Sequence, residues 1–280
     1  MSGEEVLIQV SKLNYVYPDG TVALRDIDME IGTREFIAFI GQNGSGKTTL
    51  SKCLNGLFAP TSGSVIVEGL DTRSKGIIKK IVTKVGYVFQ NPDHQLFNSS
   101  VWDEIAYGPR NIGVPENEVE ERVREAATVA GIHEEIFQEH PFFLNKGLRQ
   151  RVAIASILAL RPRTIIVDEP TTGQDRKQSV EIMNFLKKLR DEEDHTIIII
   201  THEMPIVVAY AERTVALCEG KILLDGPTRE VFSQPNVLAK TFVQPRQITR
   251  LGQQLGDLDL PPDVLTVPEM CEIFGETLSR

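Results

Sequence analysis

Cysteines and long hydrophobic runs are both scarce in this chain. Its three cysteines, Cys53, Cys218 and Cys271, are scattered, form no CxxC pair and have no histidine at metal-ligand spacing. This pattern favours reduced thiols over a disulfide framework or a zinc site. Apolar runs such as TIIIIT (196–201) are much shorter than the ~20 residues of a membrane-spanning helix, and the start MSGEEVLIQV lacks the basic segment of a signal peptide. We therefore expect a soluble intracellular protein, although one that could bind to a membrane protein.

Positive charge is also in deficit. The chain has 30 lysines and arginines against 39 aspartates and glutamates, a net charge of −9. Broad nucleic-acid binding needs a basic surface, so we expect no nucleic acid among the partners. With 280 residues, of which 41% are hydrophobic, the chain is long enough for one large α/β domain or two small ones.

Short apolar strands alternate with amphipathic helices over most of the chain. Strands are predicted at four apolar runs, EFIAFIG (35–41), KVGYVFQ (84–90), TIIVDEP (164–170) and HTIIIITHE (195–203). Because these runs are apolar on both faces, they favour a parallel sheet covered by helices on both sides. Strand-like patterns at 6–10 and 63–72 predict, in addition, an N-terminal antiparallel β subdomain.

Residues 92–160 have a different pattern. The segment ENEVEERVREAATVAGI (116–132) places apolar residues every three to four positions, which is typical of an amphipathic helix and predicts a mostly helical insert. After residue 232 the pattern loosens, and segments joined through prolines predict a small helical C-terminal extension over 233–280. The expected architecture is therefore an α/β domain over 1–232, with its helical insert, followed by this extension.

A glycine-rich motif, GQNGSGKT, runs from Gly41 to Thr48 and fits the pattern G-x-x-x-x-G-K-[ST]. Its glycines let backbone amides curl around a phosphate at a helix N-terminus, Lys47 reaches the terminal phosphates, and the Thr48 hydroxyl binds Mg²⁺. A glycine-rich turn could match by chance, but the strand before it and the helix after it are the context that the motif requires. The nucleotide-binding residues expected here are Gly41, Asn43, Gly44, Ser45, Gly46, Lys47, Thr48 and Thr49.

Four polar residues follow the predicted strands. Asp168 ends the strand TIIVD, where P-loop enzymes hold Mg²⁺, and Glu169 is placed to polarise a water for attack on the γ-phosphate. His202 follows the strand IIIIT and could reach the γ-phosphate, and Gln90 at another strand end could contact the Mg²⁺ or the water. Taken alone, DEP could be a strand cap and the histidine structural. Together with the glycine-rich motif, these four residues are expected to line one crevice at the carboxyl ends of the strands.

These pieces, in this order and with a helical insert between Gln90 and Asp168, resemble the ATP-binding-cassette (ABC) ATPases, a P-loop NTPase family, over about residues 5–232. The resemblance implies ATP and Mg²⁺ as cofactors. It also implies that Tyr17 stacks on adenine and that Asp175, in the segment GQD, shapes the interface with a second ATPase subunit.

A finer resemblance lies in VGYVFQNPDHQLF (85–97) and EIAYGPRNIGV (104–114), which are similar to the ATPase subunits of energy-coupling factor transporters. It implies an ATP-hydrolysing subunit that powers uptake of a vitamin or of a transition-metal ion such as cobalt or nickel. The implied partners are a second ABC ATPase subunit, in a homo- or heterodimer, a transmembrane coupling subunit and a substrate-capture membrane protein. The implied location is the cytoplasmic side of the cell membrane.

Three alternatives remain at this point. The chain could be the ATPase of another ABC importer, or a soluble ABC ATPase of DNA repair or translation. The DNA-repair type usually carries a long coiled-coil insertion and the translation type two cassettes, and neither pattern is visible in the sequence. The third alternative is a non-hydrolysing regulatory subunit, against which Glu169 argues and for which Lys146 argues.

The segment LNKGLRQR (144–151) occupies the place of the family's LSGGQ signature, which closes over the ATP of the opposite subunit. This sequence has Asn145 for the serine, Lys146 for a glycine and Leu148 for the glutamine. Asn145 is expected to cap a helix, whereas Lys146 is expected to place a side chain where backbone approaches phosphate. We therefore expect this chain to serve its own ATP well and to complete the site of its partner poorly.

Three carboxylates, Asp93, Asp103 and Glu104, lie in the segment that by the same resemblance faces the membrane subunit. We expect some of them to accept basic side chains from that subunit. The alternative is a solvated acidic face.

Overall fold

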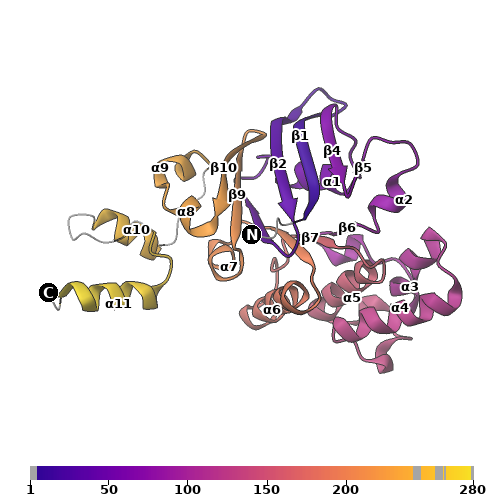
Figure 1. Cartoon of the computed structure of the whole chain (residues 1–280). Helices are drawn as coiled ribbons and strands as arrows, with labels where there is room; N and C mark the ends of the chain where they lie inside the picture. The colour runs from indigo at the N-terminus through magenta and orange to yellow at the C-terminus, as the bar shows by residue number, and fades with distance from the viewer. Residues whose placement is uncertain (1–4, 242–246, 256–260, 262, 279–280) are drawn as a thin grey trace.

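The structure is a computed structural model that describes residues 5–241, 247–255, 261 and 263–278 (Figure 1). Its N-terminal part is a four-stranded sheet of order β2-β1-β4-β5 within the described residues. The strands are β1 (Val6–Val16), β2 (Val22–Gly32), β4 (Ser62–Val67) and β5 (Leu70–Asp71), and neighbouring strands are antiparallel. The antiparallel β subdomain expected from the sequence is therefore present.

The central sheet has the order β10-β9-β3-β8-β7-β6 among the described strands. Its strands are β3 (Phe36–Ile40), β6 (Val85–Val88), β7 (Thr164–Asp168), β8 (Thr196–Ile200), β9 (Arg213–Cys218) and β10 (Lys221–Pro227). All neighbouring pairs are parallel except β9 with β10, which form an antiparallel hairpin. The parallel core confirms the fold class that the alternation of apolar strands and helices predicts.

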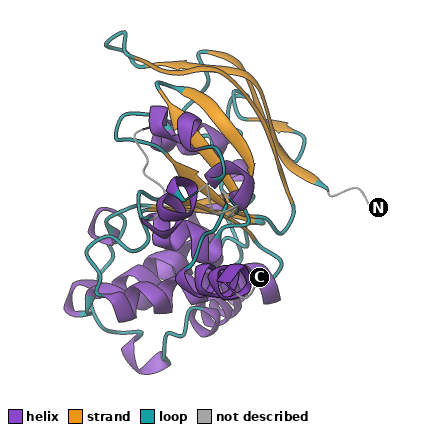
Figure 2. Ribbon diagram, turned by 90° about the vertical axis from the view of Figure 1, so that its left-hand side faces the viewer, coloured by secondary structure: helices purple, strands orange, loops and turns teal. Residues whose placement is uncertain are grey.

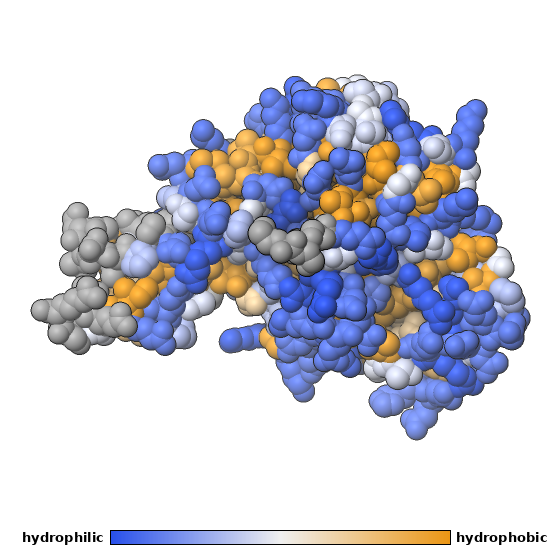
Figure 3. All heavy atoms as spheres, in the orientation of Figure 1, coloured by the Kyte–Doolittle hydropathy of each residue, from blue (hydrophilic) through white to orange (hydrophobic). Residues whose placement is uncertain are grey.

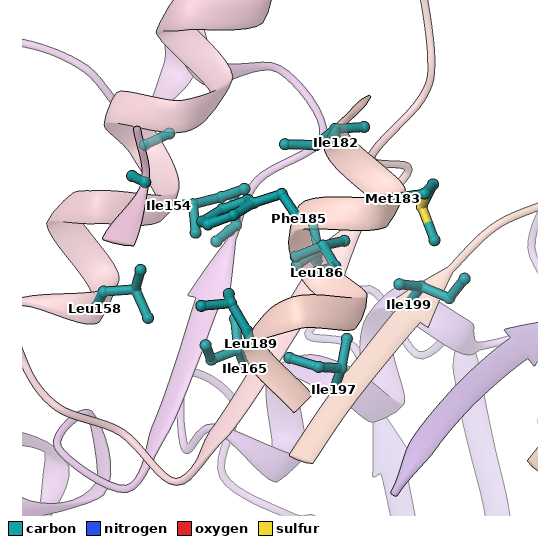
Figure 4. Packing of buried hydrophobic residues seen from close by; sticks show 14 of the residues in the cluster. Ile154, Leu158, Ile165, Ile182, Met183, Phe185, Leu186, Leu189, Ile197 and Ile199 are labelled. Carbon is teal, nitrogen blue, oxygen red and sulfur yellow. The ribbon is translucent and has the colours of Figure 1, made fainter. Parts of the chain in front are cut away.

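Both faces of the central sheet are buried, which explains why its strands are apolar throughout. Ile165 and Ile197 point into a cluster with α5 (Lys146–Leu158) and α6 (Arg176–Glu192), as Figure 4 shows. Their chain neighbours Ile166 and Ile198 face the opposite side, where α1 (Lys47–Leu54) packs with both sheets. Figure 2 shows the strands gathered at one end of the molecule and most of the helices at the other.

The insert between β6 and β7 is mostly helical. It contains α3 (Val101–Ile112), α4 (Glu116–Val129) and α5, together with the short turns η1 (Pro92–His94), η2 (Glu134–Ile136) and η3 (Pro141–Phe143). Ser100 caps α3, because its Oγ accepts a hydrogen bond from Asp103 N at 3.0 Å. Figure 1 shows these helices together on one side of the central sheet.

The other helices are short connectors and the C-terminal pieces. They are α2 (Ile78–Ile81), α7 (Met204–Tyr210), α8 (Thr228–Phe232), α9 (Pro235–Leu238), η4 (Ala239–Thr241), α10 (Gln247–Gln254) and α11 (Val267–Leu278). Helices α10 and α11 contact each other around Val264 and Met270. Arg229 of α8 pairs with Asp263 at 3.4 Å and Glu269 at 2.6 Å, which anchors these helices to the rest of the chain. Of the extension expected at 233–280, residues 242–246, 256–260, 262 and 279–280 lie outside the described part.

On the face shown in Figure 3, apolar residues form separate patches among hydrophilic ones. In the described part of the chain, no helix is long and apolar enough to cross a membrane.

Candidate functional site

Four neighbouring parallel strands, β3, β8, β7 and β6, end at the same edge of the central sheet. The segment Gly41–Thr48 follows β3, and Gln90 comes two residues after β6. Glu169 follows β7 directly, and His202 comes two residues after β8. Parallel strands place their carboxyl ends together, so residues far apart in the sequence meet at this edge.

These strand ends border a cleft of about 1000 Å³. The residues predicted from the sequence for the nucleotide and metal site all line it: Tyr17, Gly41, Asn43, Gly44, Ser45, Gly46, Lys47, Thr48, Thr49, Gln90, Asp168, Glu169 and His202. Val22 and Ala23 of β2 also line the cleft and were missed, because nothing in their local sequence marks them. The structure thus brings the whole predicted set into one space.

Glycine is required at two positions of the loop for steric reasons. Gly41 has φ +142°, and a Cβ there would lie 2.3 Å from Leu217 O. Gly46 has φ +107°, and its Cβ would lie 2.8 Å from Ala23 O. At Gly44 (φ +80°) nothing lies within 4 Å of the Cβ position, so this part of the loop is open to a ligand. The loop therefore presents bare backbone at the start of α1, as phosphate binding requires.

Lys47 is held inside this loop. Its Nζ donates hydrogen bonds to Gly41 O at 2.7 Å and to Gln42 O at 2.9 Å, and the residue is only 7% exposed. Burial lowers the pKa of the Lys47 ammonium from its ordinary value, while the charges of Glu169 and Asp168 act in the opposite direction. An ammonium has three donors, so Lys47 can offer a further hydrogen bond to a phosphate while the loop holds it.

Asp168 is a buried carboxylate, 7% exposed, with two hydroxyl donors. Its Oδ2 accepts from Tyr87 OH at 2.7 Å and from Thr48 Oγ1 at 3.3 Å. Burial raises the pKa of Asp168, and the two hydrogen bonds partly offset this effect. A carboxylate beside a threonine hydroxyl at the phosphate loop suits Mg²⁺, which usually takes one or two protein ligands plus phosphate oxygens. Within the described ranges, no group of three or more His, Cys, Asp or Glu residues is placed to hold a metal ion.

Glu169 is fixed by its backbone and by two side chains. Its φ of +49° lies in the left-handed region, which costs a non-glycine residue about 1–2 kcal/mol. Glu169 Oε1 lies 2.8 Å from His202 Nδ1, and Oε2 accepts from Thr172 Oγ1 at 3.3 Å. The carboxylate is thereby aimed in one direction. His202, which was expected to reach the γ-phosphate, contacts Glu169 in this structure.

Tyr17 lies at the side of the cleft formed by the N-terminal strands. Its OH lies 2.8 Å from Thr49 Oγ1, and its ring meets Tyr15 edge-on at 5.1 Å between centroids. Gln90 is exposed and lines the cleft after β6. Adenine stacking by Tyr17 and Mg²⁺ contact by Gln90 stay predictions.

Two residues with a positioning role were missed from the sequence. Tyr87 orients Asp168 through its hydroxyl group. The signal in the sequence was a tyrosine within the apolar strand VGYV, because buried tyrosine hydroxyls usually have a hydrogen-bond partner. Gln95 accepts from Phe89 N at 3.2 Å and donates to Ala153 O of α5 at 2.8 Å. Gln95 therefore links the segment next to Gln90 with α5. The sequence offered no signal for this link beyond the presence of a second glutamine in QNPDHQ (90–95).

Replacing Tyr87 with phenylalanine should weaken Mg²⁺-dependent ATP hydrolysis. The change removes the hydroxyl that orients Asp168, and a hydrogen bond to a charged group contributes about 1.5–3 kcal/mol, so we expect roughly tenfold more Mg²⁺ at half-maximal rate. Titration of Mg²⁺ at fixed ATP measures this. Tyr210→Phe is the matched control, since Tyr210 OH bonds to Asn184, outside the cleft. An unchanged Mg²⁺ dependence would show that Tyr87 does not position a metal ligand.

The start of α5 differs from its expected state in one respect. Asn145 caps the helix as predicted, because its Oδ1 accepts from Leu148 N at 2.9 Å. Lys146 was expected to place its side chain at the phosphate of a partner's ATP, and in this structure it contacts its own chain. Its Nζ instead donates to Thr172 O of the same chain at 2.7 Å.

Of the three carboxylates from which we expected contacts with a membrane subunit, Glu104 lies inside the fold. Glu104 is only 3% exposed, and its carboxylate accepts from Phe97 N at 2.9 Å and Asn98 N at 2.7 Å. It therefore caps this loop from inside the fold.

The other two carboxylates are half-exposed but already paired. Asp93 lies 2.9 Å from Arg149 Nε, and Asp103 lies 3.3 Å from Arg110 NH1. A contact of either with a membrane subunit stays a prediction.

Comparison with known proteins identifies similar chains over most of this sequence. The sequence profile of the ABC transporter family matches residues 24–172. A protein of Caldanaerobacter subterraneus subsp. tengcongensis, named energy-coupling factor transporter ATP-binding protein EcfA2, is 42% identical over 95% of this chain and 95% of its own length. A putative ABC transporter ATP-binding protein of the same organism is 50% identical over 90% of this chain, which spans only 44% of that relative.

Solved structures show the same architecture. The chain of cbiO1 from Clostridium perfringens, described as part of the ABC transporter complex cbiONQ, superimposes with a TM-score of 0.75 at 37% identity, covering 90% of this chain and 100% of that one. The ATP-binding cassette MJ0796, solved as a dimer in a post-hydrolysis state with ADP and phosphate, gives a TM-score of 0.71 at 27% identity, covering 79% of this chain and 99% of its own.

Proposed function

Because this chain belongs to the ABC transporter family, whose cassettes bind and hydrolyse ATP, we propose that it is the ATP-hydrolysing subunit of an energy-coupling factor importer. The observation that carries the proposal is the single cleft in which the phosphate loop, Asp168, Glu169 and His202 meet. The transported solute in this proposal is a vitamin or a transition-metal ion such as cobalt or nickel. The division into a cassette over 1–232 and an extension over 233–280 is part of the same proposal.

The geometry supports hydrolysis in the following way. The amides of Gly41–Thr48 and the Lys47 ammonium hold the phosphates of ATP. Glu169, held by His202 and Thr172, orients a water in line with the γ-phosphorus. The water oxygen forms a bond to the γ-phosphorus while the bond from the γ-phosphorus to the oxygen that bridges the β- and γ-phosphates breaks. This step releases phosphate and ADP. Mg²⁺ at Thr48, Gln90 and Asp168 would supply neutralising charge to the phosphate oxygens.

In this proposal the chain pairs with a second ABC ATPase subunit and binds a transmembrane subunit and a substrate-capture protein at the cytoplasmic side of the cell membrane. The helical insert offers an apolar surface for the membrane subunit. Phe97 is 64% exposed and Tyr107 46% exposed, and their rings meet edge-on with centroids 4.8 Å apart. Exposed aromatic pairs of this kind are typical anchors of protein interfaces.

Phe97→Ala should weaken binding of the membrane subunit while ATP hydrolysis by the chain alone is unchanged. Loss of an aromatic anchor from an interface typically costs more than 1 kcal/mol, so we expect the affinity to fall by at least about fivefold. Binding to the purified membrane subunit in detergent measures this. Leu251→Ala is the control, because Leu251 is also exposed, at 42%, but lies on α10 in the C-terminal part. Equal affinity of both variants would place the interface elsewhere.

Reconstitution in vesicles tests the whole proposal. The chain should accumulate a labelled vitamin, cobalt or nickel only with ATP when it is combined with a partner ATPase, a transmembrane subunit and a capture protein. Uptake of a different solute would favour another ABC importer. An ATPase that ignores the membrane subunit and is stimulated by DNA or ribosomes would favour a soluble ABC ATPase and overturn the proposal.

A further inference from the structure

Lys146, the first residue of α5, reaches across to the loop between β7 and α6. Its half-buried side chain donates from Nζ to Thr172 O at 2.7 Å. The next residue, Gly173, has φ +71°, and a Cβ there would lie only 2.4 Å from Lys146 Nζ. The ammonium therefore fits against the loop because residue 173 has no side chain.

The same loop contacts the carboxylate proposed to orient the water. Thr172 Oγ1 donates to Glu169 Oε2 at 3.3 Å, and Thr172 N donates to Glu169 O at 3.2 Å. Thr172 thus binds Lys146 through its carbonyl and Glu169 through its hydroxyl and amide. One residue connects the start of α5 with the reaction site of the same chain.

This connection joins two parts of the fold by a hydrogen bond, in addition to the apolar packing of α5 on α6 and the Arg151 guanidinium over the Phe185 ring. Helix α5 belongs to the helical insert, whereas residues 169–175 belong to the central sheet and the start of α6. The acceptor of Lys146 is an uncharged carbonyl, and hydrogen bonds from a charged donor are stronger than neutral ones. A shift of α5 would therefore pull on the Thr172 backbone and, through it, on the Glu169 side chain.

We propose that Lys146 is a positioning residue for hydrolysis in its own chain: by holding Thr172, it keeps the Glu169 carboxylate aimed for attack on the γ-phosphate. The role rests on the proposed function of Glu169. The proposed role differs from the one expected from the sequence. There the lysine affects the ATP bound by the partner subunit, whereas here it acts on the reaction site of its own chain.

Steady-state kinetics of the purified chain test the role. Lys146→Met keeps the apolar stem and removes the donor, so we expect kcat to fall by roughly tenfold through misplacement of Glu169, with the KM for ATP within about twofold of the original. Lys146→Arg retains a donor and should recover most of kcat. A change in the KM for ATP with an unchanged kcat would overturn the proposal. So would a Lys146→Arg variant whose kcat stays as low as that of Lys146→Met.

A double-mutant cycle shows whether the effect passes through Thr172. Thr172→Val removes the hydroxyl that binds Glu169 but leaves the carbonyl that accepts from Lys146. If Lys146 acts through Thr172, Lys146→Met should lower kcat much less in the Thr172→Val background than in the original chain. The reason is that the effects of substitutions within one hydrogen-bond network are not additive. Additive losses would place the action of Lys146 elsewhere, including on the ATP of a partner.

Hydrogen exchange provides a test that needs no hydrolysis. The amide of Gln174 bonds to Thr171 O at 3.1 Å within the loop, and Lys146→Met should raise its exchange rate several-fold. The amide of Gln178, capped by Asp175 Oδ1 at 2.8 Å at the start of α6, is the internal control and should not change. Unchanged exchange at Gln174 would overturn the positioning role. A wild-type chain that hydrolyses no ATP even together with its partner ATPase would instead refute the proposed function, while the exchange measurement still decides the loop contact.

Discussion

Glu169→Gln should lower the rate of ATP hydrolysis by about 10²–10⁴-fold, the range typical for loss of a positioned general base. The amide has the same size as the carboxylate, and it can still contact His202 and Thr172. ATP affinity should stay within a few-fold, because Glu169 is not part of the loop Gly41–Thr48 that holds the phosphates. Single-turnover hydrolysis and equilibrium titration with ATP separate these two quantities.

The control for this change is Glu192→Gln. Glu192 is an exposed carboxylate at the end of α6, paired with Lys188 at 3.6 Å, and its loss should leave hydrolysis unchanged. If Glu169→Gln hydrolyses ATP at the original rate, another group orients the water. If it no longer binds ATP but remains folded, Glu169 has a structural role in the cleft.

Lys47→Ala should weaken ATP binding by about 10- to 100-fold. A hydrogen bond from a charged group contributes about 1.5–3 kcal/mol, and alanine removes both this donor and the positive charge beside the phosphates. The loop itself also loses the bonds to Gly41 O and Gln42 O, and the charges of Asp168 and Glu169 lose a nearby cation. Isothermal titration with ATP and Mg²⁺ measures the affinity.

Two comparisons make this result specific. Lys80→Ala removes an exposed lysine on α2, outside the cleft, and should leave ATP affinity unchanged. A circular-dichroism melt of Lys47→Ala checks that the buried site remains folded without the lysine. Wild-type affinity in a folded Lys47→Ala protein would remove Lys47 from the phosphate site.

Local sequence was sufficient for the phosphate loop and for the strand-end residues. The glycines of Gly41–Thr48 must adopt backbone angles and close approaches that other residues resist, so their spacing carries the loop conformation directly. Asp168, Glu169 and His202 follow fully apolar strands, and parallel strands have their carboxyl ends at one edge. Given a parallel sheet, these residues had to be neighbours, and the cleft contains them all.

The neighbours of those residues depended on how the elements pack. Tyr87 and Asp168 are 81 residues apart, and Gln95 meets Ala153 of α5, 58 residues away, through packing within the insert. A glutamate is by default exposed, so nothing in its own sequence marks Glu104 as a buried cap of the loop at Phe97.

Lys146 shows the same division most clearly. The sequence alone determined that a lysine occupies the position of a family glycine. It also determined that Asn145, the residue before, could cap a helix. The destination of its ammonium was decided by the tertiary structure, because a four-carbon flexible side chain reaches whichever acceptor the packing provides. Here α5 and the loop after β7 lie close enough for Thr172 O, 26 residues away, to be that acceptor, with Gly173 leaving the space.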